Sequence, residues 1–174
     1  MEQPLINRVA NSGLITLKLE EFFPQQEVAH FDLKDFLFME MILKEKDFRA
    51  ALKEHDWTQY QDQILLVYCS TDAIIPVWAY MLVAAAAAPF AKDIYQGTAE
   101  DYYRTFFLRK LDELDTEQYR DKRMVIKGCS DHPVPPAAYL EVTRKLHPLA
   151  KCIMYGEPCS TVPVYKKRRR ESKN

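Results

Sequence analysis

The chain has 174 residues, of which 48% are hydrophobic and 28% charged, and its formal net charge is −1. This composition excludes an intrinsically disordered body, and a sequence pI near 6.4 argues against a uniformly basic nucleic-acid-binding protein. The low content of 4 glycines and 10 prolines excludes collagen-like and turn-rich β architectures. The length predicts a single domain, which we place at residues 1–165.

The N-terminal residues do not predict a signal peptide, because Met1 to Arg8 contain no basic region followed by an apolar stretch. The longest apolar stretch, residues 77–91, is shorter than the roughly 20 residues that cross a bilayer, and Pro89 interrupts it. We therefore expect a cytoplasmic protein without a membrane segment. In that compartment the four cysteines are expected to be thiols or metal ligands rather than disulfides.

The N-terminal third reads as a strand followed by a helix. Residues 14–20 alternate apolar and polar side chains, which is typical of a strand with one buried face. Asp32 is a suitable N-cap for a helix whose apolar positions continue to about Glu54, with or without a break near Lys46 and Asp47. We interpret residues 1–58 as an extension of the domain that follows.

From residue 62 onward, strands and helices alternate. The predicted strands are residues 64–68, 93–95, 124–127 and 152–155, and the predicted helices are about 76–90, 98–114 and 135–147. The first of these strands is an uninterrupted apolar run, as found in strands buried on both faces.

This alternation predicts an α/β fold over residues 62–163, a three-layer open sheet of about four parallel strands with helices on both faces. Right-handed crossovers leave few topologies, and the expected strand order is 2-1-3-4. In that order the strands at 64–68 and 124–127 are neighbours, with a ligand site beyond their carboxyl ends.

A short cysteine motif recurs at the predicted carboxyl ends of the strands. Cys69 follows the first strand, Cys129 the third and Cys159 the fourth. Each of them is followed by a serine, namely Ser70, Ser130 and Ser160. The fourth cysteine, Cys152, lies inside a predicted strand and reads as structural.

Three thiolates converging at one sheet edge would form a site for a zinc ion or an iron–sulfur cluster, because thiolates are the soft ligands that these groups prefer. Three positions after the first and second motif cysteines stand Asp72 and His132, and we predict His132 as the fourth ligand. Asp72, Asp131, Glu157 and the three serines are expected to hydrogen-bond to these ligands or to replace one of them.

Two alternatives stay open for the same residues. One is an enzyme that uses a reactive cysteine as a nucleophile or sulfur carrier, with His132 or Asp72 handling the proton. The other is an interaction protein without catalysis, in which the cysteines are small core residues. Neither a G-x-G-x-x-G nor a Walker A motif occurs, so nucleotide binding has no motif support. Residues 166–174 are expected to be a disordered basic tail.

Four segments spread over the chain resemble the uncharacterised bacterial family grouped as domain of unknown function 2480, found mostly in Bacteroidetes. They are residues 7–14 (NRVANSGL), 45–49 (EKDFR), 125–131 (VIKGCSD) and 155–163 (YGEPCSTVP). The family supplies no established activity. Such genes often lie beside iron–sulfur assembly genes, and the resemblance therefore implies iron–sulfur assembly proteins as partners and an iron–sulfur or sulfur-transfer role for the cysteines.

Overall fold

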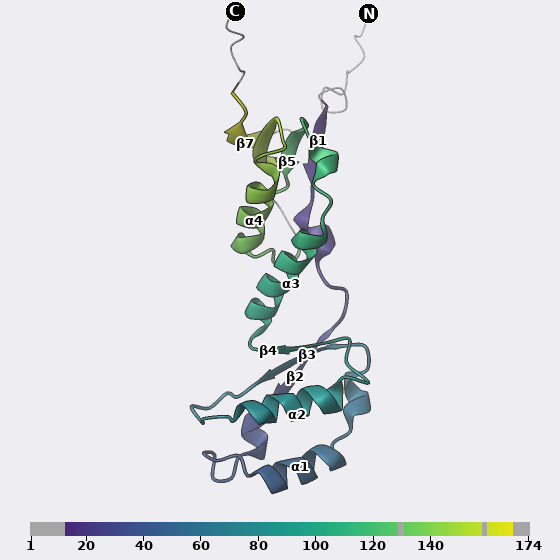
Figure 1. The fold of residues 1–174 in the computed structure, drawn as a ribbon, viewed down its shortest axis with the longest axis vertical. Coiled ribbons are helices and arrows are strands. Elements are labelled where there is room, and N and C mark those ends of the chain that lie inside the picture. The colour runs from purple at the N-terminus through teal and green to yellow at the C-terminus, as the bar shows by residue number, and fades with distance from the viewer. Residues whose placement is uncertain (1–12, 129–130, 158–159, 169–174) are drawn as a thin grey trace, which may run out of the picture. The chain divides into compact units, whose positions relative to one another are not determined.

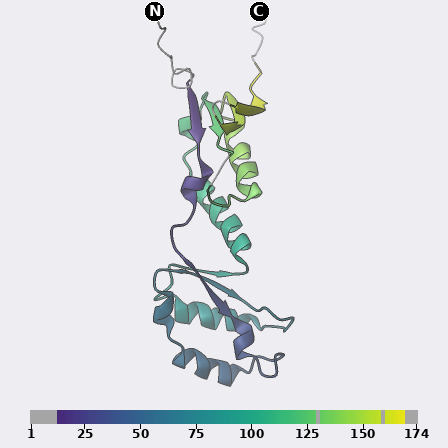
Figure 2. The same ribbon diagram turned by 180° about the vertical axis from the view of Figure 1, so that it is seen from behind.

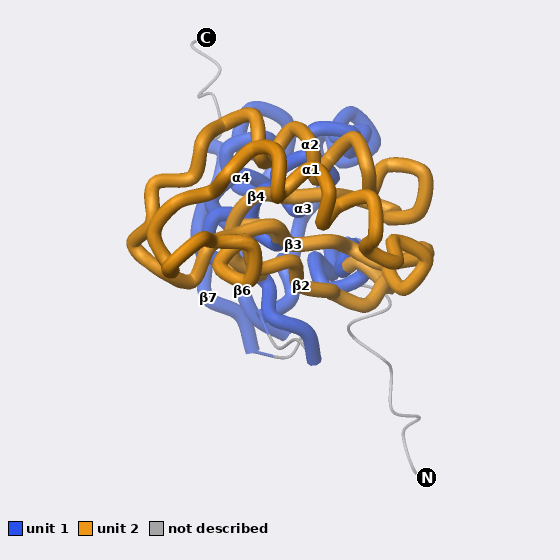
Figure 3. The backbone as a smooth tube through the Cα atoms, turned by 90° about the horizontal axis from the view of Figure 1, so that it is seen from below, with its two compact units in different colours: residues 1–23, 103–174 blue, residues 24–102 orange. Residues whose placement is uncertain are grey.

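The computed structural model describes residues 13–128, 131–157 and 160–168. The chain forms two compact units, which are coloured separately in Figure 3. Unit 1 comprises residues 1–23 and 103–174, and unit 2 comprises residues 24–102. Unit 2 is thus an insertion within the sequence of unit 1. The expectation of a single domain over residues 1–165 stays a prediction.

Unit 2 contains a three-stranded parallel sheet with two α-helices (Figure 1). In chain order its elements are β2 (Val28–Asp32), the 3-10 helix η3 (Leu33–Phe36), α1 (Glu45–Glu54), the 3-10 helix η4 (Trp57–Tyr60), β3 (Ile64–Tyr68), α2 (Val77–Ala87) and β4 (Asp93–Gln96). The strand order is β2-β3-β4. Figures 1 and 2 show α1 and α2 on the same side of this sheet, where both helices contribute to one core.

Unit 1 contains a four-stranded mixed sheet of order β1-β5-β6-β7, in which only β7 is antiparallel to its neighbour. Its elements are β1 (Leu14–Leu17), the 3-10 helix η2 (Leu19–Phe22), α3 (Ala99–Glu113, which begins in unit 2), the 3-10 helix η5 (Glu117–Tyr119), β5 (Arg123–Ile126), α4 (Pro136–Leu146), β6 (Cys152–Glu157) and β7 (Ser160–Lys166). Side chains of α3 and α4 pack in one core with those of β5 and β6.

The two units repeat the same local structure, with equivalent positions 59 residues apart. The buried face of α2 consists of Ala79, Val83 and Ala87, and that of α4 consists of Ala138, Val142 and Leu146. Both helices begin after a proline N-cap, Pro76 or Pro135, with nearly identical backbone angles. A proline suits this position because it has no N–H to leave unpaired. Each helix therefore starts at the same distance from its preceding strand.

The first strand of each sheet also repeats, at a different spacing. β1 and η2 correspond to β2 and η3, with Leu19 and Leu33 buried at the same position. β1 pairs in parallel with β5, and β2 pairs in parallel with β3. Each unit therefore takes its first strand from the N-terminal segment 14–32 and adds two strands from its own βαβ segment.

The secondary structure predicted from residue 62 onward is confirmed in every element, with boundaries shifted by a few residues at most. Cys152 is the first residue of β6, inside a strand as expected. The predicted strand at 14–20 is confirmed for residues 14–17, beyond which the chain turns into η2. The strands β2 and β7 were not predicted. The basic C-terminal run begins inside β7, which ends at Lys166.

The predicted strand order 2-1-3-4 in one parallel sheet is wrong. β3 and β4 belong to the sheet of unit 2, whereas β5 and β6 belong to the sheet of unit 1. The reason is that β1 occupies the edge of β5 where β3 was expected, and β2 occupies the corresponding edge of β3. Backbone pairing to these N-terminal strands satisfies both edges, so β3 and β5 are not neighbours in a sheet.

The predicted helix from Asp32 to Glu54 is also wrong over its first half. Asp32 does act as an N-cap, accepting a hydrogen bond from the backbone N–H of Lys34, but it caps only the short helix η3. The chain then makes a tight turn in which Met39 and Glu40 have φ values of 52° and 58°. A right-handed helix excludes such left-handed residues, so α1 begins only after this turn.

Among the residues that the structure describes, no helix is both long and apolar enough to cross a membrane.

The two cores predict separate responses to truncation. Leu65 of unit 2 and Met124 of unit 1 are equivalent, fully buried strand residues. We expect Leu65→Ala and Met124→Ala each to lower the free energy of unfolding by about 2–5 kcal/mol, because each leaves a cavity. Hydrogen exchange should show the largest loss of amide protection in residues 24–102 for the first variant and in unit 1 for the second. Equal loss in both units for either variant would contradict two distinct cores.

Candidate functional site

The carboxyl ends of the three parallel strands of unit 1 form a charged edge. β1, β5 and β6 run in parallel and in register, with Leu17 opposite Ile126 and Ile126 opposite Tyr155. The residues just beyond these pairs therefore meet at one edge of the sheet, where parallel α/β sheets bind ligands. We call this edge the unit 1 site, and its described residues with charged or ionisable side chains are Glu20, Lys127, Asp131, His132 and Glu157.

An ion pair connects β1 to β5 across the unit 1 site. The Lys127 Nζ donates to Glu20 Oε1 at 2.5 Å, and both side chains are largely shielded from solvent. The hydrogen bond to Glu20 raises the pKa of Lys127 above its ordinary value, and the nearby charges of Glu157 and Asp131 act in the same direction. Lys127 is therefore a cation at neutral pH, held at the end of β5.

The segment after β1 also holds the loop that follows β5. Glu20 Oε2 accepts a hydrogen bond from the backbone N–H of Asp131 at 3.2 Å. The ring of Phe23 stacks on the ring of His132, with centroids 4.5 Å apart and planes 11° apart. Glu20 and Phe23 thus fix the far side of the loop that carries Cys129.

The near side of that loop lies against β6. The Tyr155 ring covers Gly128 so closely that a Cβ at this position would lie 2.9 Å from the ring. The Tyr155 hydroxyl also lies 3.4 Å from the carbonyl oxygen of Gly128, to which it donates. The residues on both sides of Cys129 and Ser130 are therefore held at the unit 1 site.

The hairpin between β6 and β7 closes the site. Glu157 and Ser160 are paired across the hairpin, and Gly156 before them has a φ of +124°. A Cβ on Gly156 would lie 2.5 Å from the carbonyl oxygen of Ser160, so the hairpin requires glycine here. Within the described residues, Glu157 Oε1 is buried without a hydrogen-bond partner. Such an atom is costly unless a further group binds it.

The predicted site residues are divided between the two units. Cys129, Ser130 and Cys159 lie outside the described residues. His132, Asp131 and Glu157 belong to unit 1, and Ser160 begins β7. Cys69, Ser70 and Asp72 belong to unit 2, where they follow β3. The strand adjacency that was expected to bring Cys69 to the other two cysteines is absent, because β3 and β5 are in different sheets.

The loop after β3 has its own interactions within unit 2. Cys69 is half-buried and packs against the core of that unit, with its Sγ 3.2 Å from Thr71 Oγ1. Asp32 accepts a hydrogen bond from the backbone N–H of Ser70 at 3.1 Å. Burial raises the pKa of Asp32, but hydrogen bonds with Ser70 and Lys34 outweigh it, so the net pKa lies below its ordinary value. Asp32 is therefore ionised, and its hydrogen bond to Ser70 holds this loop in place.

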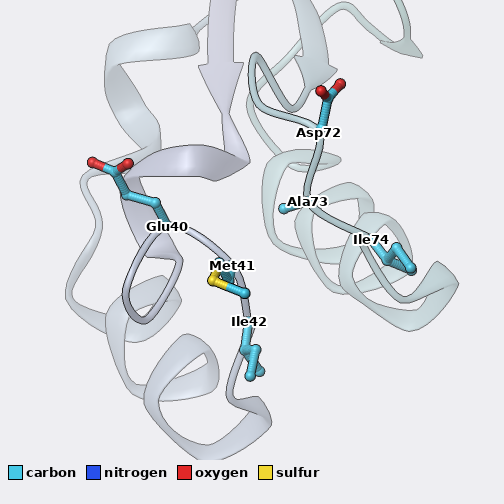
Figure 4. A pocket seen from close by; sticks show the side chains of 6 residues that line it. All are labelled: Glu40, Met41, Ile42, Asp72, Ala73 and Ile74. Atoms are coloured by element: carbon cyan, nitrogen blue, oxygen red, sulfur yellow. The ribbon is translucent and has the colours of Figure 1, made fainter.

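Asp72 has a different surrounding from that of a metal ligand. It is exposed and lines a pocket of about 520 Å³ together with Glu40, Met41, Ile42, Ala73 and Ile74 (Figure 4). In the described part of the chain, no group of three or more His, Cys, Asp or Glu side chains is placed to hold a metal ion. Cys129 and Cys159 lie outside the part of the chain that this finding covers.

Sequence reasoning missed Glu20 and Lys127, which organise the unit 1 site. Both were predicted only as the last residues of strands, and their pairing depends on β1 lying beside β5, more than a hundred residues away. The available signal was the position of Lys127, a charge directly after a buried strand and two residues before a motif cysteine.

Gly156 provides a test of the hairpin at this site. We expect Gly156→Ala to lower the free energy of unfolding by about 2 kcal/mol or more, because the new Cβ meets backbone at a left-handed φ. Gly97→Ala is the matched control, since Gly97 has the equivalent position and a similar φ but only side chains near it. Chemical denaturation measures both. Equal losses would show that φ alone, and not the close approach of Ser160, decides the effect.

The ion pair predicts a pH-dependent stability difference. Because the pKa of Lys127 is raised in the folded state, its contribution is complete below the ordinary lysine pKa and is lost as pH rises through the raised value. Glu20→Gln should therefore be less stable than the natural chain at neutral pH, and the difference should shrink in strongly alkaline buffer. Urea unfolding at a series of pH values measures it, and a difference that stays constant would contradict the pair.

Comparison with known proteins identifies the family but no characterised relative. No curated protein and no solved structure is significantly similar to the chain. The family described as "Protein of unknown function (DUF2480)" matches residues 3–167, which include both units and all four cysteines. The chain belongs to this family.

Proposed function

We propose that this protein is a cytoplasmic metal-thiolate protein whose metal site is the unit 1 site. Cys129 and Cys159 are the thiolate ligands, His132 the nitrogen ligand and Glu157 the carboxylate that completes the site. Two thiolates, an imidazole and a carboxylate form a donor set suited to zinc. An accessory role beside iron–sulfur assembly proteins is part of the same proposal.

The observation that carries the proposal is that the neighbours of both cysteines are tied to one sheet edge. Gly128, directly before Cys129, lies under the Tyr155 ring of β6. Glu157, two residues before Cys159, belongs to the same strand as Tyr155. β5 and β6 are hydrogen-bonded neighbours, so Gly128 and Glu157 lie at the same edge of the sheet. In the sequence, Cys129 is one residue after Gly128 and Cys159 is two residues after Glu157, so each thiol is a short length of chain from that edge.

The charges of the site support thiolate ligands. Lys127 provides a fixed positive charge two residues before Cys129, and a neighbouring cation favours the thiolate over the thiol. The unpartnered Glu157 Oε1 is an anionic oxygen that a cation would satisfy. A zinc ion bound here would crosslink the β5–α4 loop to the β6–β7 hairpin and so stabilise unit 1.

Cys69 is left out of the proposed ligand set. It belongs to unit 2, where it packs against the core and lies within hydrogen-bonding distance of Thr71. Asp72, the other predicted ligand on that loop, is exposed at a pocket. These surroundings favour a small, half-buried structural thiol at position 69.

A second candidate function uses the same residues without a metal. The Lys127 cation that would stabilise a metal thiolate would also lower the pKa of a nucleophilic cysteine at position 129. The protein would then be an enzyme of thiol or sulfur-transfer chemistry. Metal content and cysteine reactivity distinguish the two functions.

The experiment is metal analysis of the anaerobically purified chain together with its absorption spectrum. We expect about one zinc ion per chain and no colour, with zinc lost in Cys129→Ser and in Cys159→Ser. Cys152→Ser and Cys69→Ser are the controls and should retain the metal. Cobalt substitution should give thiolate charge-transfer absorption that disappears in the same two variants.

Three outcomes would overturn parts of this proposal. A brown chain containing iron and sulfide would replace zinc by an iron–sulfur cluster. Loss of metal in Cys69→Ser would return that residue to the ligand set. A chain that binds neither metal nor cluster, but in which one cysteine is alkylated unusually fast at neutral pH, would support the enzyme instead.

A further inference from the structure

The exposed face of helix α2 differs in its side-chain chemistry from that of α4, the equivalent helix in unit 1. The exposed positions of α2 are Val77, Met81, Ala85 and, just beyond its end, Ala88. The equivalent exposed positions of α4 are Pro136, Leu140, Arg144 and His147. The same helix thus carries charge towards solvent in unit 1 and only apolar side chains in unit 2.

The sequence of α2 contains no polar side chain apart from the hydroxyl of Tyr80 and the ring N–H of Trp78. A helix that is apolar on every face is normally covered on every face. In α2 one face is covered by the core, yet Val77 and Met81 are 76% and 67% exposed. Surface residues of this kind at one-turn spacing are typical of a protein contact.

Two pockets lie along this apolar stripe, one before its first residue and one beside Met81. Ile74, three residues before Val77, is 89% exposed and lines the pocket of about 520 Å³. Met81 lines a second pocket of about 260 Å³, formed with residues of β3 and β4. We define the α2 surface as Met41, Ile42, Ile74, Val77 and Met81. It extends from one pocket to the other along α2.

The far wall of the larger pocket is the turn between η3 and α1. In Figure 4, the turn with Glu40, Met41 and Ile42 lies opposite the loop with Asp72, Ala73 and Ile74, and the Glu40 and Ile74 side chains point away from each other. Backbone hydrogen bonds between Phe38 and Ile42 close the turn, and its left-handed residues Met39 and Glu40 are a strained conformation. The turn thus presents exposed methionines in a defined position, and such flexible thioether side chains adapt to a bound apolar group.

Two acidic residues lie beside the α2 surface, at the pocket that contains Ile74. Glu40 and Asp72 both line the larger pocket, and within the described residues neither carboxylate has an ion-pair partner. The stripe along α2 carries no charge. An occupant that complements this pattern has apolar side chains along its length and positive charge near one end.

We propose that the α2 surface binds an amphipathic helix of a partner protein, with apolar side chains one turn apart against Ile74, Val77 and Met81 and with Lys or Arg at one end against Glu40 and Asp72. An anionic membrane surface would be repelled by the same two carboxylates. This interaction is independent of the metal site, because every residue involved belongs to unit 2.

The test is fluorescence anisotropy with the full chain and a labelled helical peptide of about 16 residues, with leucines at i, i+4 and i+7 and lysines at one end. A second peptide has glutamates in place of the lysines. We expect saturable binding of the basic peptide in the micromolar range and at least tenfold weaker binding of the acidic one.

Matched variants locate the binding surface. Met81→Ser should weaken binding at least tenfold, whereas Leu140→Ser, at the equivalent position of α4 with 69% exposure, should leave it unchanged. The double variant Glu40→Gln with Asp72→Asn should remove the preference for the basic peptide. Glu27→Gln with Glu54→Gln removes two exposed carboxylates that do not line the pocket, and should keep that preference.

Several results would overturn the proposal. These are an absence of binding by the basic peptide, equal binding by Met81→Ser and Leu140→Ser, and equal affinity for the two peptides. Binding to vesicles of phosphatidylcholine with phosphatidylserine that is lost in Met81→Ser would assign the α2 surface to a membrane instead.

Discussion

The pairing of β1 with β5 is the interaction on which the unit 1 site depends. It joins residues 14–17 to residues 123–126, and the backbone N–H of Lys127 continues the ladder by donating to the carbonyl of Leu17. This register places Glu20 within hydrogen-bonding distance of both Lys127 and the backbone of Asp131, in the loop that follows β5. Closing so long a loop has an entropic cost that grows only slowly with its length, and the intervening residues fold as a unit of their own.

The internal repeat explains how one architecture carries two different surfaces. In both units a carboxylate at the end of the first strand or just after it accepts a hydrogen bond from the loop after the central strand, although the residues involved are not at equivalent positions of the repeat. Asp32 binds the N–H of Ser70 in unit 2, and Glu20 binds the N–H of Asp131 in unit 1. Both units thus have a carboxylate hydrogen-bonded to the loop after the central strand, whereas the residues around this bond differ. Unit 1 gathers charge at its sheet edge, and unit 2 exposes apolar side chains along α2.

The repeat also revises the meaning of the cysteine motif. At a spacing of 59 residues, Cys69 is equivalent to Gly128, and Ser70 is equivalent to Cys129. The similarity between the motifs at 69–70 and 129–130 therefore comes from a one-residue offset, and the proline N-caps at 76 and 135 keep the true alignment. In the sequence, Cys69 is thus the first residue after β3, whereas Cys129 is the third residue after β5.

The sequence by itself determined the local elements from residue 62 onward, because each depends on short-range periodicity. The apolar run Ile64–Val67 predicts a buried strand, and the spacing of Ala138, Val142 and Leu146 predicts the buried face of a helix. Pro76 and Pro135 mark the helix starts for an equally local reason, since a proline has no N–H to place in a helix interior. The sequence likewise singled out Glu157, His132 and Asp131, all of which belong to unit 1.

Only the tertiary structure decided which strands share a sheet. The residues of a strand predict how it is buried. They do not predict which strand it pairs with, because backbone hydrogen bonding is the same for every partner. The choice between β1 and β3 as the neighbour of β5 was therefore not encoded in either strand alone. That choice leaves Cys69 after a strand of the unit 2 sheet and brings Glu20 beside Lys127 in unit 1, through a contact between segments more than a hundred residues apart.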